Sequence, residues 1–349
     1  MDDPPSVGSA AAYTEDLLGH KRRTCSTLRK AEWTFIIVSM ATLVTVSGLT
    51  VQRIVQFAKQ RGNMTQISKP GEEPKVNLTM TDFAFACVLL FNTVFCAYYV
   101  FSGLLRERLF ELYMYMASVV VVVMYCILEY AFHTETRTSI KLVRLIIACV
   151  LGPINLVLAV LIVRSFGWLE FRVVGASETL QKMYRQRSFF FSCLAFDVQA
   201  TVSFLILAIN DGDSTDDTVR LWKILVTAIG IPLTVIWTFV ASAAVQRELK
   251  WLCVLVTVLG LCVPAYIVTQ GVVMSQSIRS LKSVEFLIAS SIICGVIFLF
   301  VRIVTLHALW KAAQNFGRGL QDEVFNFEAF GHKIHRLNDL CWCCFPESS

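Results

Sequence analysis

The chain has 349 residues and a formal net charge of +5, and 56% of its residues are hydrophobic while only 16% are charged. Average soluble domains are about one quarter charged, so this composition would coat a water-soluble globule with apolar side chains. These values exclude an ordinary soluble domain and predict that lipid is the solvent for most of the chain.

The first segment, residues 1–32, is polar and has no apolar stretch followed by a small-residue cleavage site. We therefore expect no cleavable signal peptide and interpret this segment as a disordered cytosolic tail. The first apolar stretch would then act as an uncleaved signal for the secretory pathway. The expected location is the plasma membrane or an endomembrane.

Eight apolar stretches are long enough to cross a bilayer. A spanning segment needs about 20 apolar residues closed into a helix, because an unpaired backbone amide is costly in hydrocarbon. We predict an all-α, polytopic transmembrane bundle over residues 33–309, with both termini cytosolic. Its expected helices are Trp33–Val55, Phe83–Leu105, Leu109–Phe132, Leu142–Val163, Phe189–Ile209, Leu221–Val245, Trp251–Met274 and Val284–Leu309.

Two N-x-T acceptor sequences for N-glycosylation begin at Asn63 and Asn77. Both lie in the expected loop Ala58–Asp82, which connects the first two helices. Two acceptors in one loop favour a lumenal or extracellular position for it, because such acceptors mark surface loops of secretory proteins.

Basic residues near helix ends favour the same orientation under the positive-inside rule. The connections on the opposite side carry fewer basic residues, and one of them, the loop Asn210–Thr218, carries four aspartates. The loop with Arg279 and Lys282 is a mild exception. The cations expected in the cytosol are Lys21, Arg22, Arg23, Arg29, Lys30, Arg106, Arg108, Arg164, Arg172, Lys182, Arg185, Arg187, Arg247, Lys250, Lys311, Arg318, Lys333 and Arg336.

The cysteines follow the same map. Eight of the twelve lie within expected helices, and none lies in an expected lumenal loop. A disulfide framework is therefore not expected. We interpret the thiols inside helices as small packing groups.

Polar residues at membrane depth are the sharpest functional signal. Asp197 lies inside the fifth expected helix and Arg302 inside the eighth. At about 1.5 Å per residue, both are roughly 12–13 Å below the cytosolic boundary. Asn155 follows Gly152 and Pro153 in the fourth helix and is expected at a similar level. Together these residues predict a polar layer shared by three helices.

Two interpretations of this layer remain open. In the first, the three residues line a water-filled cavity or a proton or ligand site, since ionisable groups inside a membrane mark such sites. In the second, Asp197 and Arg302 form a structural clasp, or Arg302 extends to the headgroups while Asp197 is protonated or bonded to Gln199. Pro232 and Pro264 are expected to bend their helices.

The expected cytosolic segments carry aromatic and basic residues. The loop Arg164–Arg187 is interpreted as an interfacial helix on anionic headgroups, and Trp310–Phe330 as an amphipathic segment that opens the tail 310–349. The last cysteines are interpreted as S-acylation sites, with a zinc site or ordinary reduced thiols as alternatives. These cysteines are Cys341, Cys343 and Cys344.

Sequence motifs of common enzymes are absent. The chain has no P-loop lysine motif, no H-E-x-x-H, no G-x-S-x-G and no Rossmann glycine pattern. We therefore expect no enzymatic activity and no cofactor, and no nucleic-acid partner is expected either. Eight helices, an inside amino terminus and the lack of N-P-x-x-Y argue against a G-protein-coupled receptor.

Part of the chain is similar to a known group of sequences. The residues that carry the similarity are Gly167-Trp168, Val174-Gly175-Ala176, Met183-Tyr184-Arg185 and Phe196-Asp197 through Gln199. This stretch resembles a segment of uncharacterised multipass membrane proteins of eukaryotes. The resemblance implies a membrane fold and carries no activity with it.

Two functions follow from these features. The first is a membrane protein that transports or gates a small solute or ion, with Asp197 and Arg302 in its polar layer. The second is a non-transporting receptor or adaptor that acts through its cytosolic loop and tail. The expected partners are membrane lipids together with an unidentified solute or protein.

Overall fold

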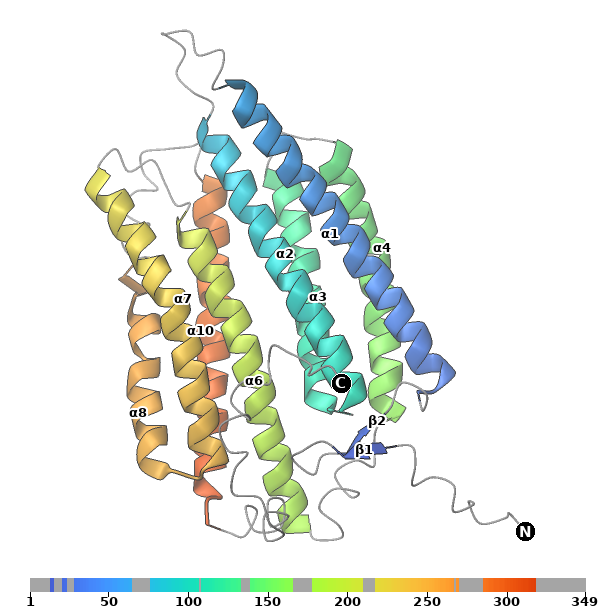
Figure 1. Cartoon of the computed structure of the whole chain (residues 1–349), viewed down its shortest axis with the longest axis vertical. Coiled ribbons are helices and arrows are strands. Elements are labelled where there is room, and N and C mark those ends of the chain that lie inside the picture. The colour runs from blue at the N-terminus through green and yellow to red at the C-terminus, as the bar shows by residue number, and fades with distance from the viewer. Residues whose placement is uncertain are drawn as a thin grey trace.

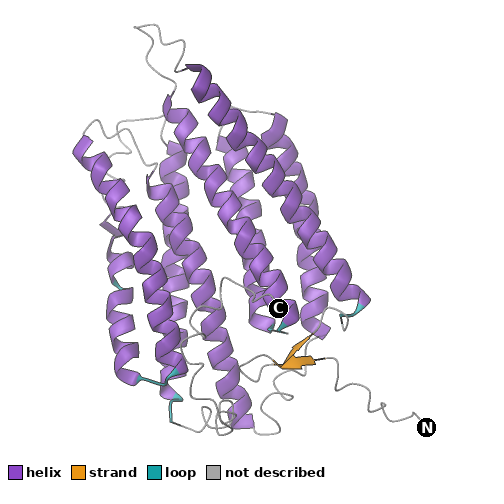
Figure 2. Cartoon of the chain, viewed as in Figure 1, coloured by secondary structure: helices purple, strands orange, loops and turns teal. Residues whose placement is uncertain are grey.

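The computed structural model describes residues 13–15, 21–23, 28–64, 76–106, 108–132, 139–165, 178–209, 217–266, 268–269 and 285–317. Helices dominate this part of the chain (Figure 2). They are α1 (Lys30–Met64), α2 (Val76–Leu105), α3 (Leu109–Phe132), α4 (Ser139–Ser165), α6 (Glu178–Ile209), α7 (Asp217–Gln246), α8 (Lys250–Gly260) and α10 (Glu285–Gln314).

A short antiparallel hairpin precedes the helices. It pairs β1 (Tyr13–Glu15) with β2 (Lys21–Arg23), so that Tyr13 lies opposite Arg23. The helix α1 then begins at Lys30, where the backbone N–H of Arg29 donates to the Glu32 carboxylate at 2.8 Å. This bond satisfies one of the free N–H groups at the helix start, as a capping box does. The segment interpreted as a disordered tail therefore includes both the hairpin and the first turn of α1.

Seven of the helices in the described part of the chain are long and apolar enough to cross a membrane. Their candidate spans are Lys30–Gln56, Phe83–Leu105, Leu109–Ile127, Leu142–Ser165, Gln181–Leu207, Ala228–Gln246 and Ile292–Gln314. The predicted fold class, a polytopic bundle of transmembrane helices, is confirmed.

The eighth expected span, Trp251–Met274, differs from the prediction. The helix α8 ends at Gly260, a turn follows at Leu261, and helical residues resume as far as Tyr266. The break lies one turn before Pro264, which has no N–H to donate to the Gly260 carbonyl and whose ring clashes with that carbonyl in a regular helix. Within the described residues the apolar run therefore gives helical segments on both sides of a break, and residues 267 and 270–274 lie outside the described part.

Several helices also run past their predicted ends. The expected loop Ala58–Asp82 is wrong over much of its length, because α1 continues to Met64 and α2 starts at Val76. Asn63 and Asn77 thus belong to the last turn of α1 and the first turn of α2. Hydropathy marks only the part of a helix inside lipid, whereas the backbone hydrogen bonds continue into water.

The bounds of the expected cytosolic segments are wrong for the same reason. The last ten residues of the expected loop Arg164–Arg187 are the first turns of α6, which begins at Glu178. The expected amphipathic segment Trp310–Phe330 begins inside α10, whose last residue is Gln314. Gly317 follows in a left-handed conformation (φ 79°), and its N–H donates to the Glu248 carboxylate at 2.8 Å.

The helices form two groups that share α6 (Figure 1). In the first group, α1 packs against α2 and α4, and α3 packs against the same two helices. In the second group, α10 packs against α6, α7 and α8, while α6 also contacts α2 and α3. The first turn of α1 and the last turn of α10 lie at the same end of the bundle (Figure 1).

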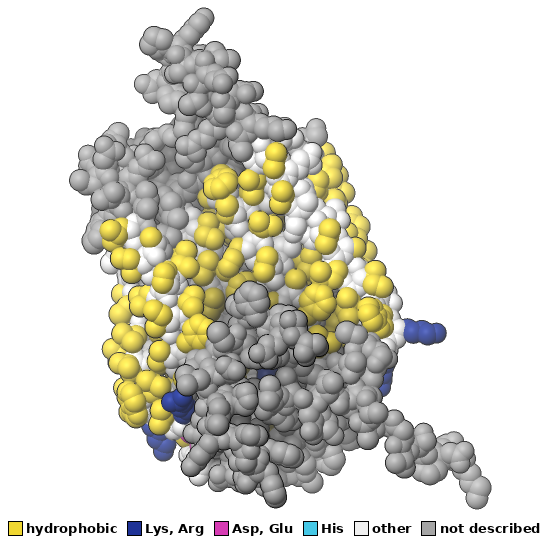
Figure 3. All heavy atoms as spheres, viewed as in Figure 1, with side chains coloured by type: hydrophobic (Ala, Val, Ile, Leu, Met, Phe, Trp, Pro, Cys, Tyr) yellow, Lys and Arg dark blue, Asp and Glu magenta, His cyan; other side chains and the backbone are white. Residues whose placement is uncertain are grey.

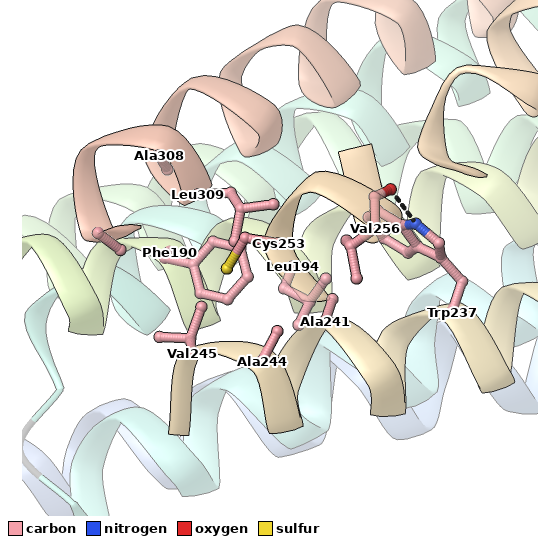
Figure 4. Packing of buried hydrophobic residues seen from close by; sticks show 11 residues of the cluster. Phe190, Leu194, Trp237, Ala241, Ala244, Val245, Cys253, Val256, Ala308 and Leu309 are labelled. Atoms are coloured by element: carbon pink, nitrogen blue, oxygen red, sulfur yellow. Dashed lines mark hydrogen bonds between the residues drawn. The ribbon is translucent and has the colours of Figure 1, made fainter. Parts of the chain in front are cut away.

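Each group has its own apolar core. Phe35, Tyr99 and Leu112 lie in the core of α1–α4, and Phe190, Trp237 and Leu309 lie in that of α6–α10. Figure 4 shows the second core, where the indole N–H of Trp237 donates to the Val256 carbonyl at 2.9 Å and joins α7 to α8.

The outer surface is apolar around its middle. Figure 3 shows hydrophobic side chains in a broad belt and Lys and Arg side chains toward the lower margin of the described surface. The exposed apolar side chains include Val157, Val254, Phe300 and Ile303. Such a belt is what a lipid-facing surface requires, because hydrocarbon replaces water around it.

Two helical glycines offer a matched test of the packing. A Cβ on Gly152 of α4 would lie 2.8 Å from Val123 Cγ2 of α3, whereas a Cβ on Gly48 of α1 would have no neighbour within 4 Å. We expect Gly152→Ala to lower the free energy of unfolding by about 1–2 kcal/mol, because the stiff valine cannot move aside. We expect Gly48→Ala to be neutral or stabilising by up to about 1 kcal/mol.

Unfolding of the two variants in detergent, followed by circular dichroism, measures both effects. Equal stability of the two variants would contradict the close approach of α3 and α4.

Candidate functional site

An ion pair joins α6 to α10 in the interior of the bundle. Arg302 Nη2 lies 3.2 Å from Asp197 Oδ2, and the two side chains are 2% and 0% exposed. Asp197 lies ten residues before Leu207, and Arg302 lies ten residues after Ile292, the boundaries of their spans at one end of the bundle. Both are therefore roughly 15 Å deep, close to the middle of a hydrocarbon core of about 30 Å.

The two side chains of this pair attract each other through their opposite charges and form few hydrogen bonds. Within the described structure, both carboxylate oxygens of Asp197 and the Nε and Nη1 atoms of Arg302 have no hydrogen-bond partner. Arg302 Nη2 donates to Thr201 Oγ1 over a long 3.5 Å. The hydroxyl of Thr201 in turn donates to the Asp197 backbone carbonyl at 2.7 Å. Four polar atoms of a buried ion pair thus remain unsatisfied, which is costly in a low dielectric.

Aromatic rings surround the guanidinium of Arg302. Its Cζ atom lies 4.0 Å from the ring centroid of Trp237 and 5.1 Å from that of Phe298. Both distances are within the range of a cation–π interaction. Since the indole N–H of Trp237 is bonded to Val256, the ring is fixed between α7 and α8 and forms a rigid wall beside the ion pair.

A second polar cluster lies on the other side of α6. Gln199 Nε2 donates to Asn92 Oδ1 at 2.6 Å, Asn92 Nδ2 donates to Ser203 Oγ at 3.0 Å, and Ser118 Oγ donates to Gln199 Oε1 at 3.0 Å. We call these four buried residues, Asn92, Ser118, Gln199 and Ser203, the α6 seam. They join α6 to α2 and α3.

Helical geometry explains why α6 is polar on two sides. Asp197 and Thr201 are four residues apart and share the face toward α10, and Gln199 and Ser203 share the face toward α2 and α3. Two residues along a helix correspond to a rotation of about 200°, so Gln199 points away from Asp197. Gln199 accordingly bonds to Asn92 and Ser118 rather than to Asp197.

Asn155 belongs to a third polar cluster. Its Oδ1 accepts a hydrogen bond from Ser39 Oγ at 2.8 Å, and its Nδ2 donates to Thr42 Oγ1 at 3.0 Å. Tyr115 adds a hydrogen bond to Ser39 at 3.2 Å. This cluster joins α1, α3 and α4, so the structure unites Asp197 with Arg302 and places Asn155 in a separate, well-satisfied network.

Of the predicted glycosylation and S-acylation sites, only the glycosylation sites lie within the residues that the structure describes. Asn63 and Asn77 lie in described helix ends, whereas Cys341, Cys343 and Cys344 lie outside the described residues. The cysteines within the described ranges form no disulfide. The same ranges contain no cluster of three or more His, Cys, Asp or Glu suited to a metal ion.

Sequence reasoning missed Trp237 and most of the α6 seam. An aromatic residue in an apolar span has no distinguishing sequence pattern, so the contact of Trp237 with Arg302 could not be predicted from the sequence. Asn92 and Ser118 are polar residues within predicted spans, and that property alone could have indicated them.

The fold and the buried polar clusters together define a polytopic helical membrane protein with an ion pair at mid-membrane depth. The chain belongs to the family of the domain of unknown function DUF7789, which matches residues 19–164 and 174–311. Both members of the ion pair lie within the matched residues. A search of curated proteins found no match, and a search of solved structures found none either.

The ion pair predicts a strong energetic coupling between α6 and α10. We expect Arg302→Met to lower the free energy of unfolding by about 3–5 kcal/mol, because it leaves the Asp197 carboxylate buried without its counter-charge. Adding Asp197→Leu should recover most of this loss, since two apolar side chains carry no desolvation cost.

A double-mutant cycle in detergent, with denaturant unfolding as the measurement, yields the coupling energy. Additive effects of the two substitutions would show that the pair does not act as a unit.

Proposed function

We propose that this protein transports or gates a small ion or solute across a membrane, with Asp197 and Arg302 at the centre of the pathway. The observation that carries the proposal is the fully buried ion pair with four unsatisfied polar atoms. Ionisable side chains at this depth are rare in membrane proteins and occur where ions, protons or polar ligands pass.

Stability alone is a poor explanation for this pair. The cost of removing two charges from water commonly exceeds their attraction, and apolar residues of the same volume would hold α6 and α10 together at least as well. The Asn155 cluster differs in this respect, because the amide has partners at both its oxygen and its nitrogen. We therefore assign the Asn155 cluster to packing and the ion pair to function.

The arrangement of α6 supports a pathway between the two helix groups. The ion pair lies between α6 and α10, and the α6 seam lies between α6 and α2–α3. A shift of one group against the other would separate one of these polar contacts and admit water to mid-membrane depth, as in the domain motions of transporters. With Asp197 and Arg302 inaccessible to solvent, this conformation is the closed one.

The orientation and the modifications belong to the same proposal. Both termini lie in the cytosol, Asn63 and Asn77 carry glycans on the opposite face, and Cys341, Cys343 and Cys344 are S-acylated. The protein is located in the plasma membrane or an endomembrane of the secretory pathway and uses neither a cofactor nor an enzymatic step. The start of α1 and the end of α10 lie at one end of the bundle, which supports the same side of the membrane for both.

Flux through purified protein in liposomes tests the transport function. We expect flux of a proton, a monovalent ion or a small polar solute, and we expect Asp197→Asn to reduce it at least about tenfold by removing the charge at mid-membrane depth. Thr45→Val is the matched control, because the Thr45 hydroxyl is exposed on α1 and is bonded to the Ala41 carbonyl of its own helix.

The absence of flux across that panel, or equal flux in the wild type and Asp197→Asn, would reject the proposal. If deletion of residues 318–349 then abolished recovery of a protein partner while Asp197→Asn did not, the receptor or adaptor function would replace it.

Glycan attachment tests the orientation separately. Expression in a glycosylating cell should give a product that shifts in electrophoretic mobility after glycosidase treatment. Asn63→Gln and Asn77→Gln should each remove one step of that shift, because the proposal places the last turn of α1 and the first turn of α2, which carry the two acceptors, on the lumenal side. A mobility unaffected by glycosidase in the wild type would contradict this orientation.

A further inference from the structure

Arg302 lies between two groups that can both stabilise a cation. On one side the Asp197 carboxylate is 3.2 Å from Nη2, and on the other the Trp237 ring centroid is 4.0 Å from Cζ. A carboxylate neutralises the guanidinium, whereas an aromatic face stabilises it without cancelling its charge. The guanidinium can therefore remain inside the bundle whether or not Asp197 is ionised.

The surroundings leave few other groups that could exchange a proton with Asp197. Arg302 of α10 is the charged group acting on Asp197, and Cys193, one turn earlier on α6, interacts with it electrostatically. From α2, Tyr99 interacts electrostatically with Cys193, and Cys96 interacts in the same way with Tyr99. The facing residue of α7 is Trp237, and the facing residue of α3 in the α6 seam is Ser118; neither titrates in the accessible pH range.

We propose that Asp197 is a proton-binding site and that Arg302 is its counter-charge, which stays on the face of Trp237, a ring it already contacts, when the proton binds and the ion pair is lost. This inference rests on the proposed transport function and names the proton as the ion that is moved or coupled. On protonation one O–H bond forms at an Asp197 oxygen, Arg302 keeps its charge, and the site changes from neutral to singly positive. On release the O–H bond breaks and the ion pair re-forms.

The polar atoms of the pair that lack hydrogen bonds are consistent with a site that alternates between an ionised and a protonated Asp197. Neither carboxylate oxygen of Asp197 has a hydrogen bond in the described structure, so either can accept a proton without breaking one. Thr201 Oγ1 lies 3.5 Å from Arg302 Nη2 and provides a neutral acceptor for the guanidinium when the ion pair is lost.

Trp237 is placed to act as a positioning residue for Arg302. Its N–H is bonded to Val256, and a Cβ added to Gly260 would lie 3.3 Å from its ring. The indole is thus held by α8 close to the break in that helix. Movement of α8 would shift the ring and would weaken the support that the ring gives to the guanidinium of Arg302.

Infrared difference spectroscopy of the full chain in liposomes tests the site without requiring transport. We expect a carbonyl band of a protonated carboxylic acid that titrates with pH and is absent in Asp197→Asn. In Arg302→Gln the midpoint of this titration should move to higher pH, because the carboxylate loses its cation.

In Trp237→Leu the midpoint should instead move to lower pH by about one unit, because the guanidinium loses the face that supports it in the protonated state. Trp237→Phe keeps an aromatic face and should remain close to the wild type. It also serves as the milder variant if Trp237→Leu folds poorly. Trp310→Leu is the matched control, since Trp310 is 64% exposed on α10.

The possible results distinguish the proton-binding site, the role of Trp237 and the transport function from one another. The lack of a titrating band that depends on Asp197 would overturn the proton-binding site. A shift of Trp237→Leu to higher pH, or an equal shift in Trp237→Phe, would overturn the role of the aromatic face. Titration without flux would keep the site and reject transport, whereas flux of another ion without titration would keep transport and reject this inference.

Discussion

The meeting of opposite charges inside hydrocarbon is the constraint on which the arrangement of these helices depends. A lone carboxylate or guanidinium at this depth would be very costly, so α6 and α10 must present Asp197 and Arg302 to each other. Their contact at 3.2 Å fixes both the rotation and the relative depth of the two helices. Trp237 then connects that contact to α7 and α8 through its ring and its N–H.

The helix α6 has two opposite polar faces, and through them it contacts both groups of helices. One face turns Asp197 toward α10, and the other turns Gln199 toward α2 and α3. A helix polar on one side only could join a single neighbouring group. By carrying polar residues two positions apart, α6 joins both groups of helices, and it is the most buried of the candidate spans.

Residue type and depth along the membrane normal were enough to single out Asp197 and Arg302. An acid and a base at matching levels of two spans have few ways to avoid the cost of burial other than pairing. The same reasoning placed Asn155 beside them, although its partners are Ser39 and Thr42 of α1. Depth gives the level of a residue in the membrane, but it does not say which neighbouring helix the residue faces.

The sequence by itself determined that the chain forms membrane-spanning helices and where their apolar parts lie, because backbone groups in lipid must bond within their own segment. It left undetermined the polar ends of α1, α2 and α6, which continue beyond the apolar parts, and the break in α8. The tertiary structure alone decided which helices are neighbours, how each is rotated, and that Trp237 faces Arg302. Those features depend on side-chain packing between segments that are distant in the sequence, and the hydropathy of one segment does not predict which segment it packs against.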